Sequence, residues 1–266
     1  FFHLYLRAVP EFNVDNAPSL VWRKPVDSAL PLTIDLDFLH KDKFIFTESH
    51  IEELIKLICI GITQFDLDAD NFGIFVTRKE HPVRKTKRNN TFWKQGLHVY
   101  VVGVLLDQTA AKNMYQYLVS RITPFCEKYK FANPPADILD NKVSPWGKTG
   151  VLMCGDLKPN ISDRYYVCFS ANYQGALLED PEFFVKPKHF PASEWHSTLK
   201  KYSKYLYAFF YHPKRIENWN VIAMDEQKVE EPLTKITKTY TPQKNSAFDL
   251  ELFLKATNTH VPTWDE

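Results

Sequence analysis

The chain has 266 residues, of which 44% are hydrophobic and 15% aromatic, and its formal net charge is +1. This length suits one sizeable domain, or a domain with an appendage, and the apolar content suffices for a packed core, which excludes wholesale disorder. Because the net charge is close to zero, a polyanionic partner would have to be bound by a local basic patch.

Hydrophobic periodicity predicts strands and helices that alternate along the chain. The expected strands are residues 1–8, 32–38, 71–77, 97–106, 151–154 and 165–170. The expected helices are residues 50–64, 109–129 and 193–210. The segments that read as irregular are residues 9–31 and 171–192. Ser49 and Glu52 fit a capping box at the start of the first helix, and the aromatic stripe of the last helix is typical of a core-facing surface. The interleaving predicts an α/β or α+β domain.

A change in composition divides the chain near its C-terminal end. Residues 222–246 are charged and polar, which is typical of a linker or an extended arm. We therefore expect a folded domain over residues 1–221 and a linker or arm over residues 222–266, in which residues 247–256 form a short helix.

Cysteine usage and hydropathy bear on the compartment. The four cysteines are scattered singly, without a Cys-x-x-Cys pair, which argues against a zinc ribbon and a disulfide framework. This usage fits a reducing intracellular compartment. No apolar run reaches 18 residues and no signal-peptide pattern is present, so we expect no membrane span. Because the chain starts at Phe1 without a methionine, we expect it to be a piece of something longer.

A basic stretch runs from Arg78 to Lys94 against the single acid Glu80. The plain interpretation is a solvated loop. The functional interpretation is a contact with the phosphate backbone of a nucleic acid. The candidate residues for that contact are Arg84, Lys85, Lys87 and Arg88. Trp93 and Tyr100 are aromatic candidates for stacking on a base or sugar, although packing is the plainer role for Trp93.

Two carboxylates lie one residue apart in the apolar segment from Leu32 to Phe38. Successive strand side chains point to opposite faces, so the apolar side chains share one face while Thr33, Asp35 and Asp37 share the other. The two carboxylates are then about 7 Å apart, which is two rises of about 3.3 Å. Like charges this close are unfavourable without a compensating cation, and hard divalent cations prefer oxygen ligands. The pair therefore indicates a metal site, although an Asp-x-Asp on a strand also occurs by chance.

Two further segments carry polar groups that fit the same chemistry. His98 lies in the expected strand 97–106, on the face opposite to its apolar neighbours. Asp140 follows two apolar residues, and a Gly-x-x-Lys that ends at Lys158 comes after it. Each signal is weak alone, because a single strand histidine is commonly structural and an aspartate after apolar residues commonly caps a helix or forms a turn.

In this order and spacing, the three segments resemble the catalytic core of the archaeo-eukaryotic primase superfamily. Its members show an acid pair on a strand, a small residue two before a histidine on a second strand, and an acid after apolar residues. The nearest resemblance is to the primase-polymerase domain of the primase-helicases of large nucleocytoplasmic DNA viruses. In that domain a lysine four residues before the histidine and a Gly-x-x-Lys after the third acid are usual, and Lys94 and Lys158 occupy those positions. The resemblance covers about residues 30–170 and implies a mixed sheet flanked by helices.

The resemblance also implies an activity, a DNA primase or polymerase that adds nucleotides to a 3′-hydroxyl on a single-stranded DNA template during replication. Two-metal chemistry with Mg²⁺ or Mn²⁺ is implied, because two metals stabilise both the attacking and the leaving oxygen. The implied catalytic and metal-binding carboxylates are those of Asp35, Asp37 and Asp140. The residues implied to bind the nucleoside triphosphate are His98, Lys94 and Lys158. The implied partners are template, primer, nucleoside triphosphates and a helicase domain on the longer chain, and a viral origin would place the protein in the host cell's replication compartment.

One departure from the family pattern concerns the third acid. The third family motif often reads acid, two residues, valine and tyrosine, whereas Asp140 is followed by Asn141, Lys142, Val143 and Ser144. The tyrosine is therefore missing, and Asp137, three residues earlier, is the alternative third acid.

Three other interpretations stay open. A glycosyltransferase with an Asp-x-Asp metal site explains Asp35 and Asp37 but leaves His98 without a role. A replication-initiator endonuclease needs two histidines flanking one apolar residue, and here the residues that flank Val99 are His98 and Tyr100. A catalytically silent DNA-binding or assembly module predicts DNA binding without metal-dependent incorporation.

Overall fold

The computed structural model describes residues 2–12, 15, 17, 21–22, 30–65, 71–87, 89–140, 151–158, 163–174, 184–207 and 220–222. Within this part of the chain, a seven-stranded sheet forms the centre of the domain. The hydrogen-bonded order of its main path is β2 (Leu30–His40), β5 (Asn90–Leu106), β3 (Asn71–Arg78), β7 (Tyr166–Gln174) and β8 (Phe184–His189). All neighbours along this path are antiparallel.

The remaining strands extend this sheet or pair separately. β4 (Val83–Lys87) pairs antiparallel with β5, and β9 (Asn220–Ile222) pairs parallel with it. β1 (Val21–Trp22) and β6 (Val151–Leu152) form a separate two-stranded sheet. The sheet is therefore mixed, which confirms the predicted class.

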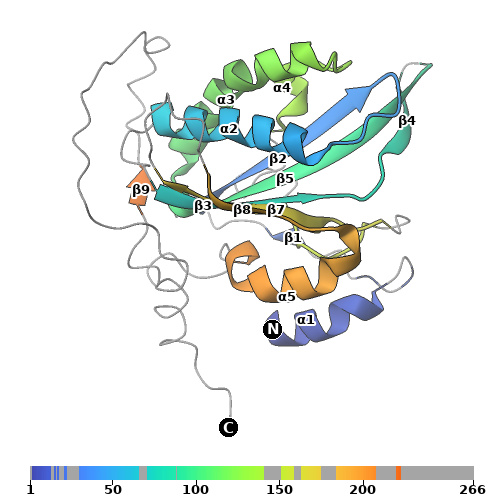
Figure 1. The fold of residues 1–266 in the computed structure, drawn as a ribbon, viewed down its shortest axis with the longest axis vertical. Coiled ribbons are helices and arrows are strands. Elements are labelled where there is room, and N and C mark those ends of the chain that lie inside the picture. Colours follow the sequence, from blue (N-terminus) through green and yellow to red (C-terminus); the bar gives the residue numbers. More distant parts are fainter. Residues whose placement is uncertain are drawn as a thin grey trace.

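Helices cover both faces of the sheet (Figure 1). The helices on one face are α2 (Glu48–Phe65) and α3 (Gln108–Lys128), with the short α4 (Pro135–Ile138) following α3. The helices on the other face are α1 (Phe2–Ala8), which is followed by the 3-10 turn η1 (Val9–Glu11), and α5 (Trp195–Leu206), which is preceded by the 3-10 turn η2 (Ala192–Glu194). Of the described helices, none is long and apolar enough to cross a membrane.

The alternation of the acid strand is confirmed. Leu32, Ile34 and Leu36 are fully buried in the core that β2 shares with α2 and α3. The aspartates of the same strand point to the opposite face. The core under α1 and α5 contains Tyr100 and Val102 of β5, which lie on that same face, and His98 is the next residue of β5 on it. The polar residues of this face therefore lie beside that apolar core.

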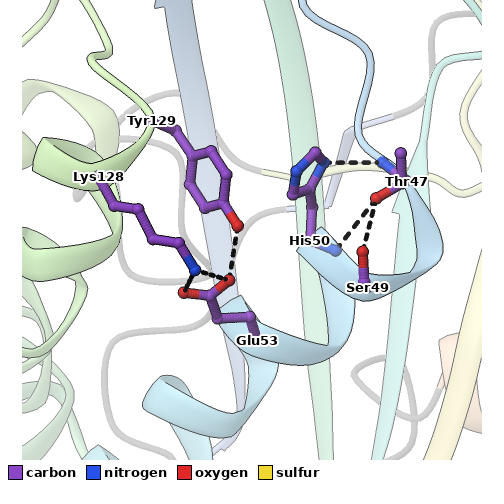
Figure 2. A network of polar contacts seen from close by, with 6 residues as sticks. All are labelled: Thr47, Ser49, His50, Glu53, Lys128 and Tyr129. Carbon is purple, nitrogen blue, oxygen red and sulfur yellow. Dashed lines mark hydrogen bonds and ion pairs between the residues drawn. The ribbon is translucent and has the colours of Figure 1, made fainter.

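The start of α2 shows which side chain caps it (Figure 2). The Thr47 hydroxyl accepts a hydrogen bond from the backbone N–H of His50 (3.3 Å), and His50 Nδ1 accepts one from the N–H of Thr47 (3.1 Å). This reciprocal pair is a capping box in which a histidine replaces the usual Glu or Gln. The predicted box of Ser49 and Glu52 is therefore wrong, and Glu52 instead contacts His189 of β8 (2.7 Å).

The same view shows how α2 is tied to the end of α3 (Figure 2). Lys128 Nζ donates to both carboxylate oxygens of Glu53 at 2.8 Å, and the Tyr129 hydroxyl donates to one of them at 2.6 Å. The contact joins α2 and α3, the two helices that pack against the apolar face of β2.

The prediction of a strand at residues 1–8 is wrong, because residues 2–8 form α1. Tyr5 and Val9 are four residues apart, lie on one side of the helical segment and are both buried. The Tyr5 hydroxyl donates to the carbonyl of Cys154 (3.2 Å), and its ring meets that of Tyr207 edge-on at 5.8 Å. Such long-range packing decides between helix and strand for a short apolar run.

Other boundaries also differ from the prediction. The basic stretch belongs to a β4–β5 hairpin rather than to a loop, and β5 begins at Asn90. Residues 171–192 are not wholly irregular, since β7 runs to Gln174 and β8 follows. The predicted arm after residue 222 and its short helix lie outside the described residues, so the domain boundary stays a prediction.

Candidate active site

The two acids of β2 lie beside polar positions of β5. In the antiparallel register Asp35 is opposite His98, and Asp37 is opposite Gly96. Partners in such a register share one face of the sheet. The side chain of Asp35 is buried, whereas that of Asp37 is partly open to solvent. The sheet thus presents one buried and one accessible carboxylate on the same face.

The segment after α4 brings Asp140 to the acid strand. The backbone N–H of Asp140 donates to the carbonyl of Asp35 (2.9 Å), and Leu139 forms an isolated antiparallel bridge with Leu36. Asp137 lies in α4. Asp140 therefore lies closer to Asp35 along the backbone than the alternative third acid does.

Asn133, which the sequence alone did not identify as a site residue, forms hydrogen bonds with the edge of β2. β2 is the outermost strand, so its outer backbone groups need partners. Asn133 Nδ2 donates to the carbonyl of Asp37 (2.7 Å), and its Oδ1 accepts from the N–H of Leu39 (2.9 Å). The buried Asn133 amide thus does what a neighbouring strand would do, and it fixes the backbone that directly follows the Asp37 side chain.

Burial makes the ionised form of Asp35 unfavourable. Desolvation, together with the nearby charges of Asp37 and Asp140, raises the pKa of Asp35 to about 7, against the lowering effect of Lys158 and Lys94. Asp35 Oδ1 lies 3.4 Å from His98 Nε2, in a geometry that makes no hydrogen bond. A buried carboxylate oxygen without a donor is a group that a cation would satisfy.

The carboxylates by themselves supply only some of the ligands that a divalent cation needs. Among the residues that the structure describes, no three His, Cys, Asp or Glu side chains form a cluster that could hold a metal ion. Mg²⁺, however, commonly binds one or two carboxylates and completes its shell with substrate phosphates and water. The unsatisfied oxygen of Asp35 and the adjacent Asp37 fit that kind of site.

Lys94 neutralises Asp37 in this structure. Its Nζ lies 2.5 Å from Asp37 Oδ2, and both side chains are 27% exposed. Lys158 is exposed and close enough for its charge to act on both Asp35 and His98. The basic residues predicted from the sequence are therefore gathered around the acid pair.

His98 is held as a neutral imidazole. Burial, followed by the charges of Lys158, Lys94 and Lys79, lowers its pKa to about 3. Its ring stacks on the ring of Tyr165 at a centroid distance of 3.9 Å. A neutral imidazole has one donor and one acceptor nitrogen, so His98 can still donate one hydrogen bond to an anionic ligand.

Gly96 leaves the space that the Tyr165 hydroxyl occupies. A Cβ at position 96 would lie 2.6 Å from the Tyr165 hydroxyl oxygen and 3.2 Å from Asp37 Oδ1. The small residue two before the histidine therefore has a steric reason here. The small residue is recognisable in the sequence, whereas the role of Tyr165 is not, because nothing in the spacing connects the two segments.

We expect Gly96→Ala to lower the free energy of unfolding by about 1–3 kcal/mol, the usual cost of overpacking. Because the clash is with the hydroxyl, the double variant Gly96→Ala/Tyr165→Phe should recover most of that loss. Thermal melting of the two variants, with Tyr165→Phe alone as the control, checks this. A double variant no more stable than Gly96→Ala would contradict the contact.

The hairpin register separates the predicted nucleic-acid residues. Lys85 pairs with Phe92 and Lys87 with Asn90, which places both lysines on the same face as Lys94. Arg84 lies on the opposite face, with its guanidinium 5.1 Å from the ring centre of Trp93. Arg88 lies outside the described residues.

A groove of about 490 Å³ begins at the acids on this side. Its lining includes Lys85, Lys87 and Lys94 from the β4–β5 hairpin, and Asn133, Asp137 and Asp140 from the segment after α3. Tyr100 does not contribute to any such surface, because it is buried under α5. Its predicted role in stacking on a base is therefore wrong, whereas Trp93 is partly exposed beside its cations.

The sheet flanked by helices is compatible with the catalytic core of an archaeo-eukaryotic primase. Residues 1–168 match the family described as the C962R protein N-terminal AEP domain, and the chain belongs to this family of the archaeo-eukaryotic primase superfamily. The match contains the acids, His98 and both predicted lysines. No curated protein matches the chain. At the level of the family, the chain is a primase-polymerase-type nucleotidyltransferase domain, and enzymes of this kind use divalent metals.

Proposed function

We propose that this domain adds nucleotides to a 3′-hydroxyl on a single-stranded DNA template, as a DNA primase or polymerase in DNA replication. The observation that carries the proposal is the buried, unsatisfied carboxylate of Asp35, which lies beside a second acid and is surrounded by basic side chains. Acids that attract a cation and lysines that attract phosphates are the two requirements of phosphoryl transfer.

The chain's own residues divide these tasks. Asp35 and Asp37 would hold the divalent cations, Mg²⁺ or Mn²⁺, with Asp140 as the third acid. Bound cations supply charge stabilisation to the attacking and leaving oxygens. The neutral His98 donates a hydrogen bond to the triphosphate, and Lys94 and Lys158 offset its negative charge.

The groove beside the acids is the proposed path of the nucleic acid. Its lining contains lysines of the β4–β5 hairpin as well as Asp37. Lys85 and Lys87 are exposed and face this groove, so they can contact successive backbone phosphates.

We expect Lys85→Gln/Lys87→Gln to weaken binding of single-stranded DNA and to reduce the slope of log K against log salt by about 1.4, which is 0.7 for each lost phosphate contact. Arg84→Gln is the matched control, because the Arg84 side chain lies on the other face over Trp93. Fluorescence anisotropy at several salt concentrations measures both slopes. An equal change in the Arg84 variant would contradict the assignment of the groove.

The glycosyltransferase alternative differs in its donor substrate. Incubation with nucleoside triphosphates and single-stranded DNA, in parallel with sugar nucleotides, separates the two classes. The proposal expects incorporation from nucleoside triphosphates and no turnover of sugar nucleotides. Turnover of sugar nucleotides alone would replace it.

The wider setting also belongs to the proposal. The resemblance to viral primase-helicases supports a helicase domain on a longer chain, and the scattered cysteines support an intracellular location. In a viral setting this would be the host cell's replication compartment.

A further inference from the structure

Lys79 extends the polar face of the sheet beyond the predicted residues. In the β3–β5 register Thr77 is opposite His98 and Arg78 is opposite Leu97, where the pairing ends. Lys79 follows directly, and the same register continued by one residue places it beside Gly96. Gly96 in turn pairs with Asp37. Two spacings of about 4.8 Å between neighbouring strands place the backbone of Lys79 about 10 Å from that of Asp37. The acid and the lysine therefore lie in one row across three strands.

The space between them is filled by Tyr165. Its hydroxyl lies over Gly96, and its ring stacks on His98 at 3.9 Å. Lys79 Nζ lies 5.6 Å from the centre of the same ring, within the range of a cation–π contact. The Tyr165 ring thus contacts both the imidazole of His98 and the ammonium group of Lys79.

Three ammonium groups converge here. The charges of Lys158, Lys94 and Lys79 all act on His98, and burial together with Lys158 and Lys94 lowers the pKa of Lys79. Asp163 is the acid whose charge acts in the opposite direction. Lys94 is paired with Asp37, and Asp163 offsets part of the charge of Lys79, but three ammonium groups still gather around one ring. The arrangement therefore fits a ligand with several negative charges.

The order of the lysines along the site decides which part of the ligand each one meets. Lys94 contacts Asp37 directly at 2.5 Å, whereas Lys79 follows β3, which is two strands away from the acids, and contacts Tyr165. Contacts lead from Asp35 to His98, then to Tyr165 and then to Lys79. The reacting phosphate has to lie at the acids, so the terminal phosphate lies toward Lys79.

We propose that Lys79 binds the terminal phosphate of the nucleoside triphosphate, that Tyr165 positions its ammonium group, and that the pair selects triphosphates over diphosphates and monophosphates. This inference rests on the proposed function, since it assigns a further residue to the same nucleotide site. Lys79 is a binding residue in this account, and Tyr165 is a positioning residue.

The test compares the affinity of the whole chain for a nucleoside triphosphate, diphosphate and monophosphate in Mg²⁺ without DNA, by isothermal titration calorimetry. The variant is Lys79→Gln, and Lys112→Gln on the exposed side of α3 is the control with the same change of charge. We expect the triphosphate affinity to fall about tenfold in Lys79→Gln, as for a lost charge-assisted hydrogen bond. The diphosphate and monophosphate affinities should change less than twofold, and Lys112→Gln should match the wild type.

Each result separates the inference from the proposed function. An unchanged triphosphate affinity, or an equal fall for all three ligands, would overturn the assignment of Lys79 while leaving a nucleotide-binding domain. A wild-type protein that binds none of the three ligands would overturn the proposed function and the inference with it. Lys79→Met keeps the apolar stem beside Tyr165, so it replaces Lys79→Gln in the comparison if that variant melts below the wild type.

Discussion

Asp35→Asn is expected to abolish nucleotide incorporation and, in the same protein, to raise the melting temperature at pH 8 in the absence of metal. Incorporation is lost because an amide binds a divalent cation poorly compared with a carboxylate. Stability rises because the wild-type chain must bury the charge of Asp35 without a hydrogen-bond donor for its Oδ1. The opposite directions of the two effects mark a residue kept for function at a cost in stability.

The pKa of Asp35 determines how the difference in stability between Asp35→Asn and the wild type depends on pH. The pKa of Asp35 is raised from the ordinary value of 3.8 to about 7 in the folded protein. Between these values the folded chain binds the proton more tightly than the unfolded chain, so the contribution of Asp35 to stability falls as the pH rises through this window. A shift of this size corresponds to an effect on the order of 2–4 kcal/mol above pH 7, or roughly 5–10 °C in melting temperature.

Thermal melting at pH 4, 6 and 8 without metal measures this contribution. The gain of Asp35→Asn over the wild type should be absent at pH 4 and largest at pH 8, and Mg²⁺ with nucleotide should stabilise only the wild type. Asp42→Asn, on an exposed side chain at the end of β2, is the control. A variant that melts below the wild type at pH 8 would show that the Asp35 carboxylate is stabilised by groups other than a metal.

Lys94→Met is expected to strengthen the binding of a divalent cation and to weaken the binding of nucleotide. The Lys94 ammonium group lies 2.5 Å from Asp37 Oδ2 and so supplies the positive charge that a metal would bring. Removing it frees the carboxylate for a cation, and we expect severalfold tighter binding of Mn²⁺ alone. The same change removes a phosphate partner, so we expect about a tenfold loss in triphosphate affinity.

Titration of Mn²⁺ without nucleotide, and of nucleotide at saturating Mn²⁺, gives the two affinities separately. Lys128→Met is the matched control, because Lys128 also pairs with a carboxylate, that of Glu53 (Figure 2). This pair joins α2 and α3 on the face of the sheet opposite to the acids. Weaker binding of both ligands in Lys94→Met would mean that the lysine only supports the local structure.

The period of two in β2 made the acid face predictable, since four apolar side chains had to share the core. The long periodic helices were equally clear, because residues 50–64 and 109–129 repeat over several turns. The apolar run at residues 1–8 was too short to distinguish a helix from a strand, and its packing on Cys154 and Tyr207 decided the matter.

Site residues on neighbouring strands could be predicted from the sequence. Site residues that are brought together by contacts between distant segments could not. Asp35 and His98 lie on neighbouring strands, and the family resemblance supplied their common role. Tyr165 and Asn133 act through contacts with residues about 70 to 100 positions away. The division between Lys85 and Arg84 also depends on hairpin register, which the sequence alone leaves undetermined.

Incorporation of labelled nucleotides on single-stranded DNA, with and without a primer and in Mg²⁺, Mn²⁺ or chelator, tests the central claim most directly. The account predicts products that require a divalent metal and that disappear in Asp35→Asn and Asp37→Asn, while both variants still bind DNA. Primer-free products would identify a primase, and products that need a primer would identify a polymerase. Products that persist in chelator or in both variants would contradict the account, and DNA binding without any product would favour a catalytically silent module.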